Sequence, residues 1–242
     1  MNTLRIILLT IPFSLSACAT TDRYAVNQST PVKHEQADAR IALGLSYIRQ
    51  RQMPKAQYNL SLAIEHAPDY YKAQLALAYY FEQVNEPLQA QALYHRALKI
   101  HPNNGYVLNN YASYLCRYGE YRQAQELLEQ ALATSAYPAT VVTLENAALC
   151  SLKAGDQTQA RHYFQRVFDH DPSRIDAALQ LAKLDIESGE LSLARQRLLP
   201  VYRLQPQHRD TLALLVELET HDNNQAMRQY YQSKLDRLRP SQ

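Results

Sequence analysis

The stretch AQYNLSLAIEHAP, residues 56–68, is followed 34 residues later by AQALYHRALKIHP, residues 90–102. Ala56, Ala63 and Pro68 of the first stretch recur in the second, as Ala90, Ala97 and Pro102. Small residues allow two antiparallel helices to pack closely, and proline cannot continue a helix. The chain is therefore predicted to be an array of repeated helical units.

A period of 34 residues is typical of tetratricopeptide repeats, in which each unit is a pair of helices. The 242 residues have room for about six such units after an N-terminal segment. We predict an all-α fold, a right-handed superhelix or solenoid of about six repeats over 37–242. The expected units are 37–70, 71–104, 105–140, 141–174, 175–208 and 209–242.

Two further signals share this register. Glycines fall between the paired helices of three units, where a left-handed residue ends the first helix: Gly119, Gly155 and Gly189. Alanine recurs in the second helix of the first five units, but Arg228 takes its place in the sixth. Because an array needs a terminal unit with a polar outer face, 209–242 is predicted to be a degenerate cap.

The N-terminus is predicted to be a lipoprotein signal peptide, residues 1–17. Arg5 precedes an apolar run that is too short to cross a bilayer. The run ends in Leu15-Ser16-Ala17-Cys18, which resembles a bacterial lipobox. The resemblance implies that Cys18 is lipidated and anchors the chain at the periplasmic face of the outer membrane. The polar residues after it, with Pro31, predict that 18–36 are a flexible tether.

Charge and motifs exclude several function classes. The 25 Lys and Arg are nearly balanced by 23 Asp and Glu, so no basic surface for nucleic acid is expected. The sequence contains no phosphate-binding glycine loop, HExxH or Gly-x-Ser-x-Gly motif. We therefore expect no enzyme, cofactor or small-molecule substrate. His66, His101 and His170 lie near the ends of second helices, where they are expected to pair with terminal carbonyls rather than bind metal.

Two cysteines remain once Cys18 is assigned to the lipid. Cys116 and Cys150 lie on the first helices of adjacent units, and neighbouring first helices run parallel. An even pair of cysteines in an oxidising compartment favours a disulfide. The alternative is two buried free thiols.

Residues 37–240 resemble the PilF/PilW lipoproteins, the pilotins of type IV pilus biogenesis. The most specific part is Asn109-Asn110-Tyr111-Ala112-Ser113-Tyr114-Leu115-Cys116, and Pro102-Asn103-Asn104-Gly105, Tyr137-Pro138 and 145–150 continue the likeness. The resemblance implies binding to the outer-membrane secretin of the pilus machine, help with its localisation or multimerisation, and hence pilus formation and twitching motility. The alternative is a periplasmic repeat lipoprotein that recruits peptidoglycan hydrolases.

The repeat geometry suggests where a partner binds. In such an array, the first helices line a concave groove with positions 2, 5, 9, 12 and 13 of each unit. In units one and two several of these positions are apolar: Ile41, Leu45, Ile48, Leu75 and Tyr79. An apolar stripe suits an amphipathic or extended partner segment. The alternative is that Leu45 and Ile48 pack against the tether or a neighbouring helix. The same positions are more polar in later units, for example Asn109, Glu145 and Lys183.

Overall fold

A computed structural model describes residues 30–134 and 137–238, which form twelve α-helices and no strand. The helices are α1 (Thr30–Arg49), α2 (Met53–His66), α3 (Tyr71–Gln83), α4 (Pro87–Ile100), α5 (Gly105–Arg117), α6 (Tyr121–Ala133), α7 (Thr140–Lys153), α8 (Gln157–His170), α9 (Ile175–Glu187), α10 (Leu191–Leu204), α11 (Arg209–His221) and α12 (Gln225–Arg237). They form six consecutive pairs, so the predicted all-α solenoid of six units is confirmed.

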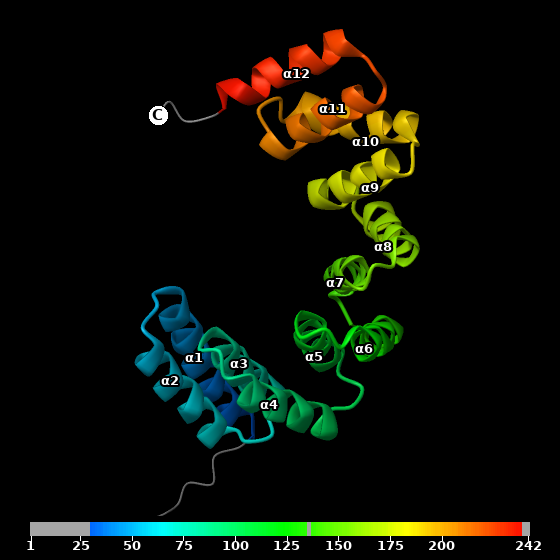
Figure 1. Ribbon diagram of the computed structural model, residues 1–242. Coiled ribbons are helices and arrows are strands. Elements are labelled where there is room, and N and C mark those ends of the chain that lie inside the picture. The colour runs from blue at the N-terminus through cyan, green and yellow to red at the C-terminus, as the bar shows by residue number, and fades with distance from the viewer. Residues whose placement is uncertain (1–29, 135–136, 239–242) are drawn as a thin grey trace, which may run out of the picture.

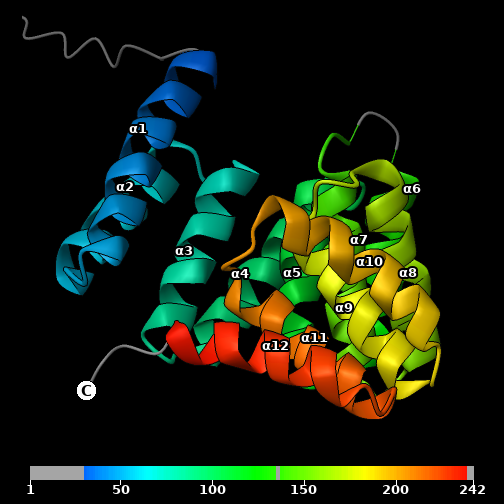
Figure 2. The same cartoon turned by 90° about the horizontal axis from the view of Figure 1, so that it is seen from above.

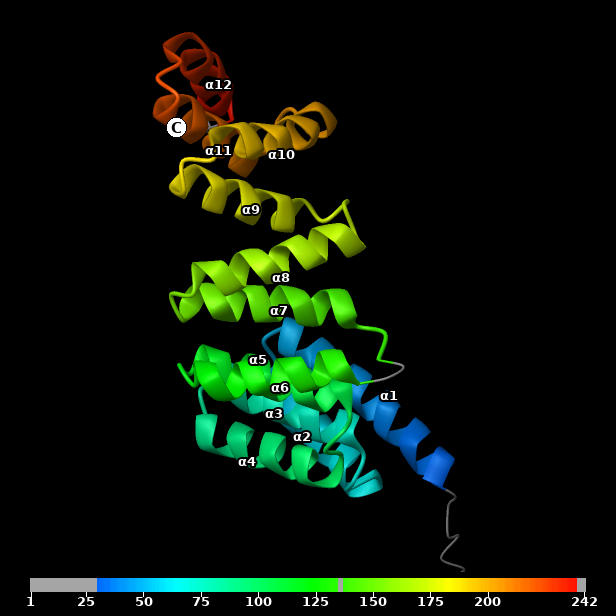
Figure 3. The same cartoon turned by 90° about the vertical axis from the view of Figure 1, so that its right-hand side faces the viewer.

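The pairs follow one another along an open curve (Figure 1). The first helices α5, α7 and α9 lie on its inner side, and the second helices α6, α8 and α10 lie on its outer side. Views turned by 90° show the helices of successive units stacked one after another (Figures 2 and 3). Each first helix packs against its own second helix and against the unit before it. The first helices thus form a continuous inner surface, as the repeat geometry predicts.

Small residues make this packing possible. Ala56, Ala90, Ala124, Ala160 and Ala194, in phase on the second helices, are fully buried. On the first helix of unit one, Gly44 serves the same purpose, because a Cβ there would lie only 2.5 Å from Leu60 Cγ. The alanine and glycine positions therefore set how closely the helices approach.

The turn within each pair needs one residue with left-handed backbone geometry. Glycine supplies it in units three to five, with φ between +80° and +86°. The other three units use Arg51, Asn85 and Asn223, with φ of 56–59°. The sequence pattern revealed the glycine turns only, since arginine and asparagine do not identify such a turn by themselves.

Helix α1 begins earlier than the sequence suggested. It starts at Thr30, so residues 30–36 of the predicted flexible tether are helical. Pro31 does not prevent this, because the N–H groups of the first helical turn have no acceptor within the helix and proline is tolerated there. Ala37, about two turns after the start of the helix, is fully buried. The signal peptide, Cys18 and residues 18–29 lie outside the described part of the chain.

Unit three, 105–140, is two residues longer than the other units, and Tyr137 lies in its longer connection between α6 and α7. Its buried ring covers Gly105, where an added Cβ would lie 2.5 Å from Tyr137 Cγ. Thr143 donates a hydrogen bond to the Tyr137 hydroxyl at 3.1 Å. Two of the motifs that carry the family resemblance therefore contact each other. At the other end of the array, Tyr231 is the buried residue of α12, whose other residues are polar or partly exposed.

Candidate partner-binding surface

The apolar stripe predicted for units one and two is largely part of the core. Ile41 and Ile48 are only 9% and 6% exposed and belong to the N-terminal core cluster with Leu60 and Ala73. They are buried because α1 packs against both α2 and α3. These two isoleucines therefore do not offer a docking surface, which corrects the expectation of an open stripe.

Three of the five predicted groove residues remain accessible. Leu45 and Leu75 are partly buried at the edges of the core clusters, and Tyr79 is 40% exposed. Tyr79 lies one turn after Leu75 on α3, so the two side chains share a helical face. The accessible apolar surface of these units is therefore small and centred on α3.

The residues most similar to the pilotins join unit three to both of its neighbours. Tyr114 donates a hydrogen bond to the Pro87 carbonyl at 2.9 Å, and the Tyr111 ring stacks on Tyr94 with centroids 5.7 Å apart. Burial, followed by the nearby Glu82 carboxylate, raises the pKa of Tyr94 above its ordinary value. These tyrosines act as packing groups between units two and three.

The link to unit four runs along the inner surface. Asn146 donates a hydrogen bond to the Asn109 side-chain oxygen at 2.9 Å. Cys116 and Cys150 form a disulfide, with Cα atoms 5.7 Å apart. One stretch of α5 therefore has both hydrogen-bonded and covalent contacts with α7.

An open cleft lies on the inner surface of units four to six rather than on the first two. It has a volume of about 580 Å³, and residues of α7, α9 and α11 line it. Exposed Leu149 and partly buried Leu214 form apolar patches between charged side chains, whereas Leu179 beside them belongs to the core. Arg174 at one edge lies 3.4 Å from Glu145, an ion pair that joins α9 to α7. The cleft can accept an extended segment of mixed polarity.

A series of polar contacts between units was missed at the sequence level. A side chain near the start of α6, α8 and α10 reaches the end of the next first helix: Gln125 to Ser151, Arg161 to Asp185, and Arg195 to Glu219. We call these three pairs the polar clamp. Equivalent residues of successive pairs are spaced by 34 or 36 residues, so the repeat register of the sequence already relates these three pairs.

The histidines do not form a metal site. Nε2 of His101 lies 2.6 Å from the Asp69 carbonyl oxygen of the preceding turn, so His101 joins two units instead of pairing with its own helix end. His66 and His170 are the last residues of α2 and α8. Across the described residues, no group of His, Cys, Asp and Glu has the arrangement of a metal site. None of the described helices has the length and apolarity to cross a membrane.

Comparison with known proteins fits this architecture. The tetratricopeptide repeat family model matches residues 83–137 and 151–218. The type IV pilus assembly protein PilF of Pseudomonas aeruginosa is 31% identical over 182 residues, which cover 75% of this chain and 72% of the relative. This chain belongs to the PilF family of tetratricopeptide repeat proteins. The family resemblance inferred from the sequence is confirmed.

Other relatives share the family's fold. An uncharacterised protein of Haemophilus influenzae is 34% identical over 143 residues, 59% of this chain and 77% of that protein. The solved structure of P. aeruginosa PilF has a TM-score of 0.75 at 30% identity and covers 87% of this chain and 95% of its own. The structure of PilW, a type IV pilus biogenesis factor, also has a TM-score of 0.75, at 24% identity, with 85% and 94% covered.

Proposed function

We propose that this chain acts in type IV pilus biogenesis as a lipid-anchored pilotin of the outer membrane, which binds the pilus secretin and promotes its localisation and multimerisation. The observation that carries the proposal is the match to PilF along most of the array. The lipobox ending at Cys18 supports the anchor. A repeat solenoid with an open inner cleft is suited to binding a protein segment.

Deletion of the gene tests the function. We expect loss of surface pili and of heat-resistant secretin multimers, both restored by the wild-type gene. A Cys18→Ala variant should leave the folded array intact but mislocalise the secretin, and mass spectrometry of the mature N-terminus should detect diacylglycerol on the wild-type protein only. Normal secretin multimers in the deletion strain, or a pull-down that recovers peptidoglycan hydrolases without secretin, would contradict the proposal.

A test of the surface that contacts the secretin requires a variant that does not disturb the core. Tyr79 is suitable because it is 40% exposed, whereas replacing buried Ile41 by Asp would destabilise α1. If units one and two bind the secretin, Tyr79→Asp should reduce its multimers. Leu88→Asp, on the second helix of the same unit, is the control because Leu88 is 77% exposed. Equal levels of secretin multimers in the two strains would indicate that the contact lies on another surface, such as the cleft of units four to six.

A further inference from the structure

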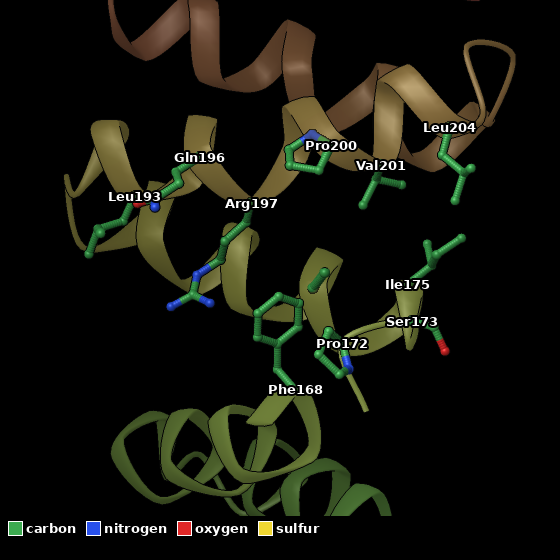
Figure 4. A pocket seen from close by; sticks show the side chains of 11 residues that line it. Phe168, Pro172, Ser173, Ile175, Leu193, Gln196, Arg197, Pro200, Val201 and Leu204 are labelled. Carbon is green, nitrogen blue, oxygen red and sulfur yellow. The ribbon is translucent and has the colours of Figure 1, made fainter. Parts of the chain in front are cut away.

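The outer side of unit five carries an apolar cavity of about 470 Å³ (Figure 4). Its floor is made by Phe168 at the end of α8, Ile175 at the start of α9, and Val201 of α10. Leu193, Pro200 and Leu204 of α10 line its open side. This cavity lies between the end of α8, the start of α9 and α10, and it is separate from the inner cleft.

The three residues on the open side break the pattern of the repeat. At the equivalent positions unit three has Gln123, Gln130 and Thr134, and unit four has Gln159, Arg166 and His170. In units one to four no more than one of these three positions is apolar. The outer face of a second helix is therefore normally polar, and the core of the solenoid does not require leucine there.

The apolar side chains in unit five are accessible. Leu204 is 75% exposed and Leu193 is 42% exposed. Together with Pro200 they follow one face of α10 from residue 193 to residue 204, a length of roughly 17 Å at 1.5 Å per residue. This length is enough for the apolar face of a short amphipathic helix, whose side chains at i, i+4 and i+7 span roughly 11 Å.

The polar groups at the cavity define the chemistry of an occupant. Arg197 is already neutralised, since its guanidinium lies 2.8 Å from Asp185 and also donates to Gln165 at 3.0 Å. An apolar side chain can therefore enter without leaving that charge unpaired. Pro200 has no N–H to donate to the Gln196 carbonyl one turn earlier, so this carbonyl lacks its usual donor within the helix.

The charged side chains of α10 itself are all positive. Helix α10 contains three arginines and no Asp or Glu. Arg195 and Arg197 are paired with carboxylates of the first helices, whereas exposed Arg203 has no ion-pair partner among the described residues. Arg203 lies two turns after Gln196 on the same face of α10, so a carboxylate on an occupant could pair with it.

From these features we propose that the outer face of unit five is a second docking site, which binds an acidic amphipathic helix of a partner protein. A leucine or aromatic side chain of this helix fills the cavity, and a neighbouring Asp or Glu pairs with Arg203. A second copy of this chain fits less well, because α10 contains no Asp or Glu that could pair with Arg203 of the other copy.

Peptide selection tests this site directly. A library of random 16-residue peptides displayed on phage is selected on the purified full chain, and each round is depleted on a Leu193→Asp/Leu204→Asp variant. Enriched peptides should carry large apolar residues at helical spacing and a net negative charge. A synthetic peptide of this kind should bind the double variant at least tenfold more weakly, as measured by fluorescence anisotropy.

Matched variants separate the site from general surface effects. Leu88→Asp should bind the peptide like wild type, because Leu88 has nearly the same exposure as Leu204 but lies on α4. Arg203→Glu should weaken binding several-fold, and circular dichroism should show that all variants remain folded. The proposal is overturned by any of four results: no enrichment, enrichment of basic peptides, equal binding to the double variant, or self-association of the wild-type chain that Leu204→Asp abolishes.

Discussion

At the scale of single residues, Asp185 is the most constrained charge in the array. Its side chain is fully buried, and its two carboxylate oxygens accept from Arg161 and Arg197. The arginines come from α8 and α10, so one carboxylate of α9 joins second helices of two units. Removing a buried carboxylate leaves two guanidinium groups without a counter-charge in a place where water cannot fully replace it.

Replacement of Asp185 by Ala is therefore expected to destabilise the chain by about 3–5 kcal/mol, the usual cost of breaking a buried ion pair. Urea unfolding followed by circular dichroism measures this change. Asp176→Ala on the same helix is the control, because Asp176 is exposed and only interacts with the helix dipole. Similar unfolding free energies for the two variants would show that the clamp does not contribute to stability.

The polar clamp also shows what the sequence could and could not reveal. The 34-residue register predicted the buried alanines and the turn glycines, because their role depends only on local backbone and helix spacing. Arg161 and Asp185 depend on the orientation of α8 against the next unit. On the sequence alone, both are ordinary charged residues of an amphipathic helix, and their pairing emerges only when the units are stacked.

At the scale of elements, the turn of unit one has an unfavourable residue. Arg51 has φ of 58°, which lies in the left-handed region of the backbone. This conformation costs a residue with a side chain about 1–2 kcal/mol of conformational energy, whereas glycine adopts it at little cost. Arg51→Gly should therefore raise the unfolding free energy by about 1 kcal/mol.

Thermal unfolding of two variants checks this prediction. Gly119→Ala is the reciprocal change in unit three, where φ is 86°, and should lower the melting temperature. Asn85→Gly should have a smaller effect than Arg51→Gly, because asparagine tolerates the left-handed region. A lower melting temperature for Arg51→Gly would show that the arginine side chain makes a contact worth more than the backbone strain.

The proline inside α10 provides a second prediction for an element. Pro200 removes one backbone hydrogen bond from the helix interior, which typically costs about 3 kcal/mol relative to alanine. Pro200→Ala should therefore raise the unfolding free energy by about 1–3 kcal/mol. Pro54→Ala is the control, since Pro54 lies at the start of α2, where no such bond is lost.

Pro200→Ala also bears on the proposed docking site. The alanine restores a donor for the Gln196 carbonyl and removes part of the apolar wall. The variant should thus gain stability and bind the selected peptide more weakly. A gain in stability without any loss of binding would leave Leu193 and Leu204 as the contact residues and exclude a role for the carbonyl.

At the scale of the whole molecule, the disulfide joins the third unit to the fourth near the middle of the array. The bridge closes a loop of 34 residues, which the chain-entropy model converts to about 3–4 kcal/mol of stabilisation. A Cys116→Ser/Cys150→Ser variant should unfold at a lower temperature than wild type, and reductant should lower the wild-type value but leave the variant unchanged. Alkylation that modifies both cysteines without prior reduction would contradict the bridge.

The inner surface could be predicted only in part, for a reason that concerns the whole array. Repeat positions assign side chains to the inner side of the array, but the packing between units decides which of them are covered. Ile41 and Ile48 are buried where α1 packs against α3, whereas Leu149 is exposed and lines an open cleft. The sequence contains no direct measure of this packing.

The polar clamp changes where one module of this protein ends and the next begins. Each clamp joins a second helix to the following first helix, so its two partners lie on opposite sides of the conventional unit boundary. Removal of α8 and α9 together, residues 157–190, would eliminate Arg161 and Asp185 as a complete pair and keep the two remaining clamps intact. Removal of α7 and α8 would instead leave Gln125 facing Asp185. The modules that keep each clamp pair complete are therefore shifted by one helix from the repeats that the sequence displays. Removal of residues 157–190 would still take Asp185 away from Arg197.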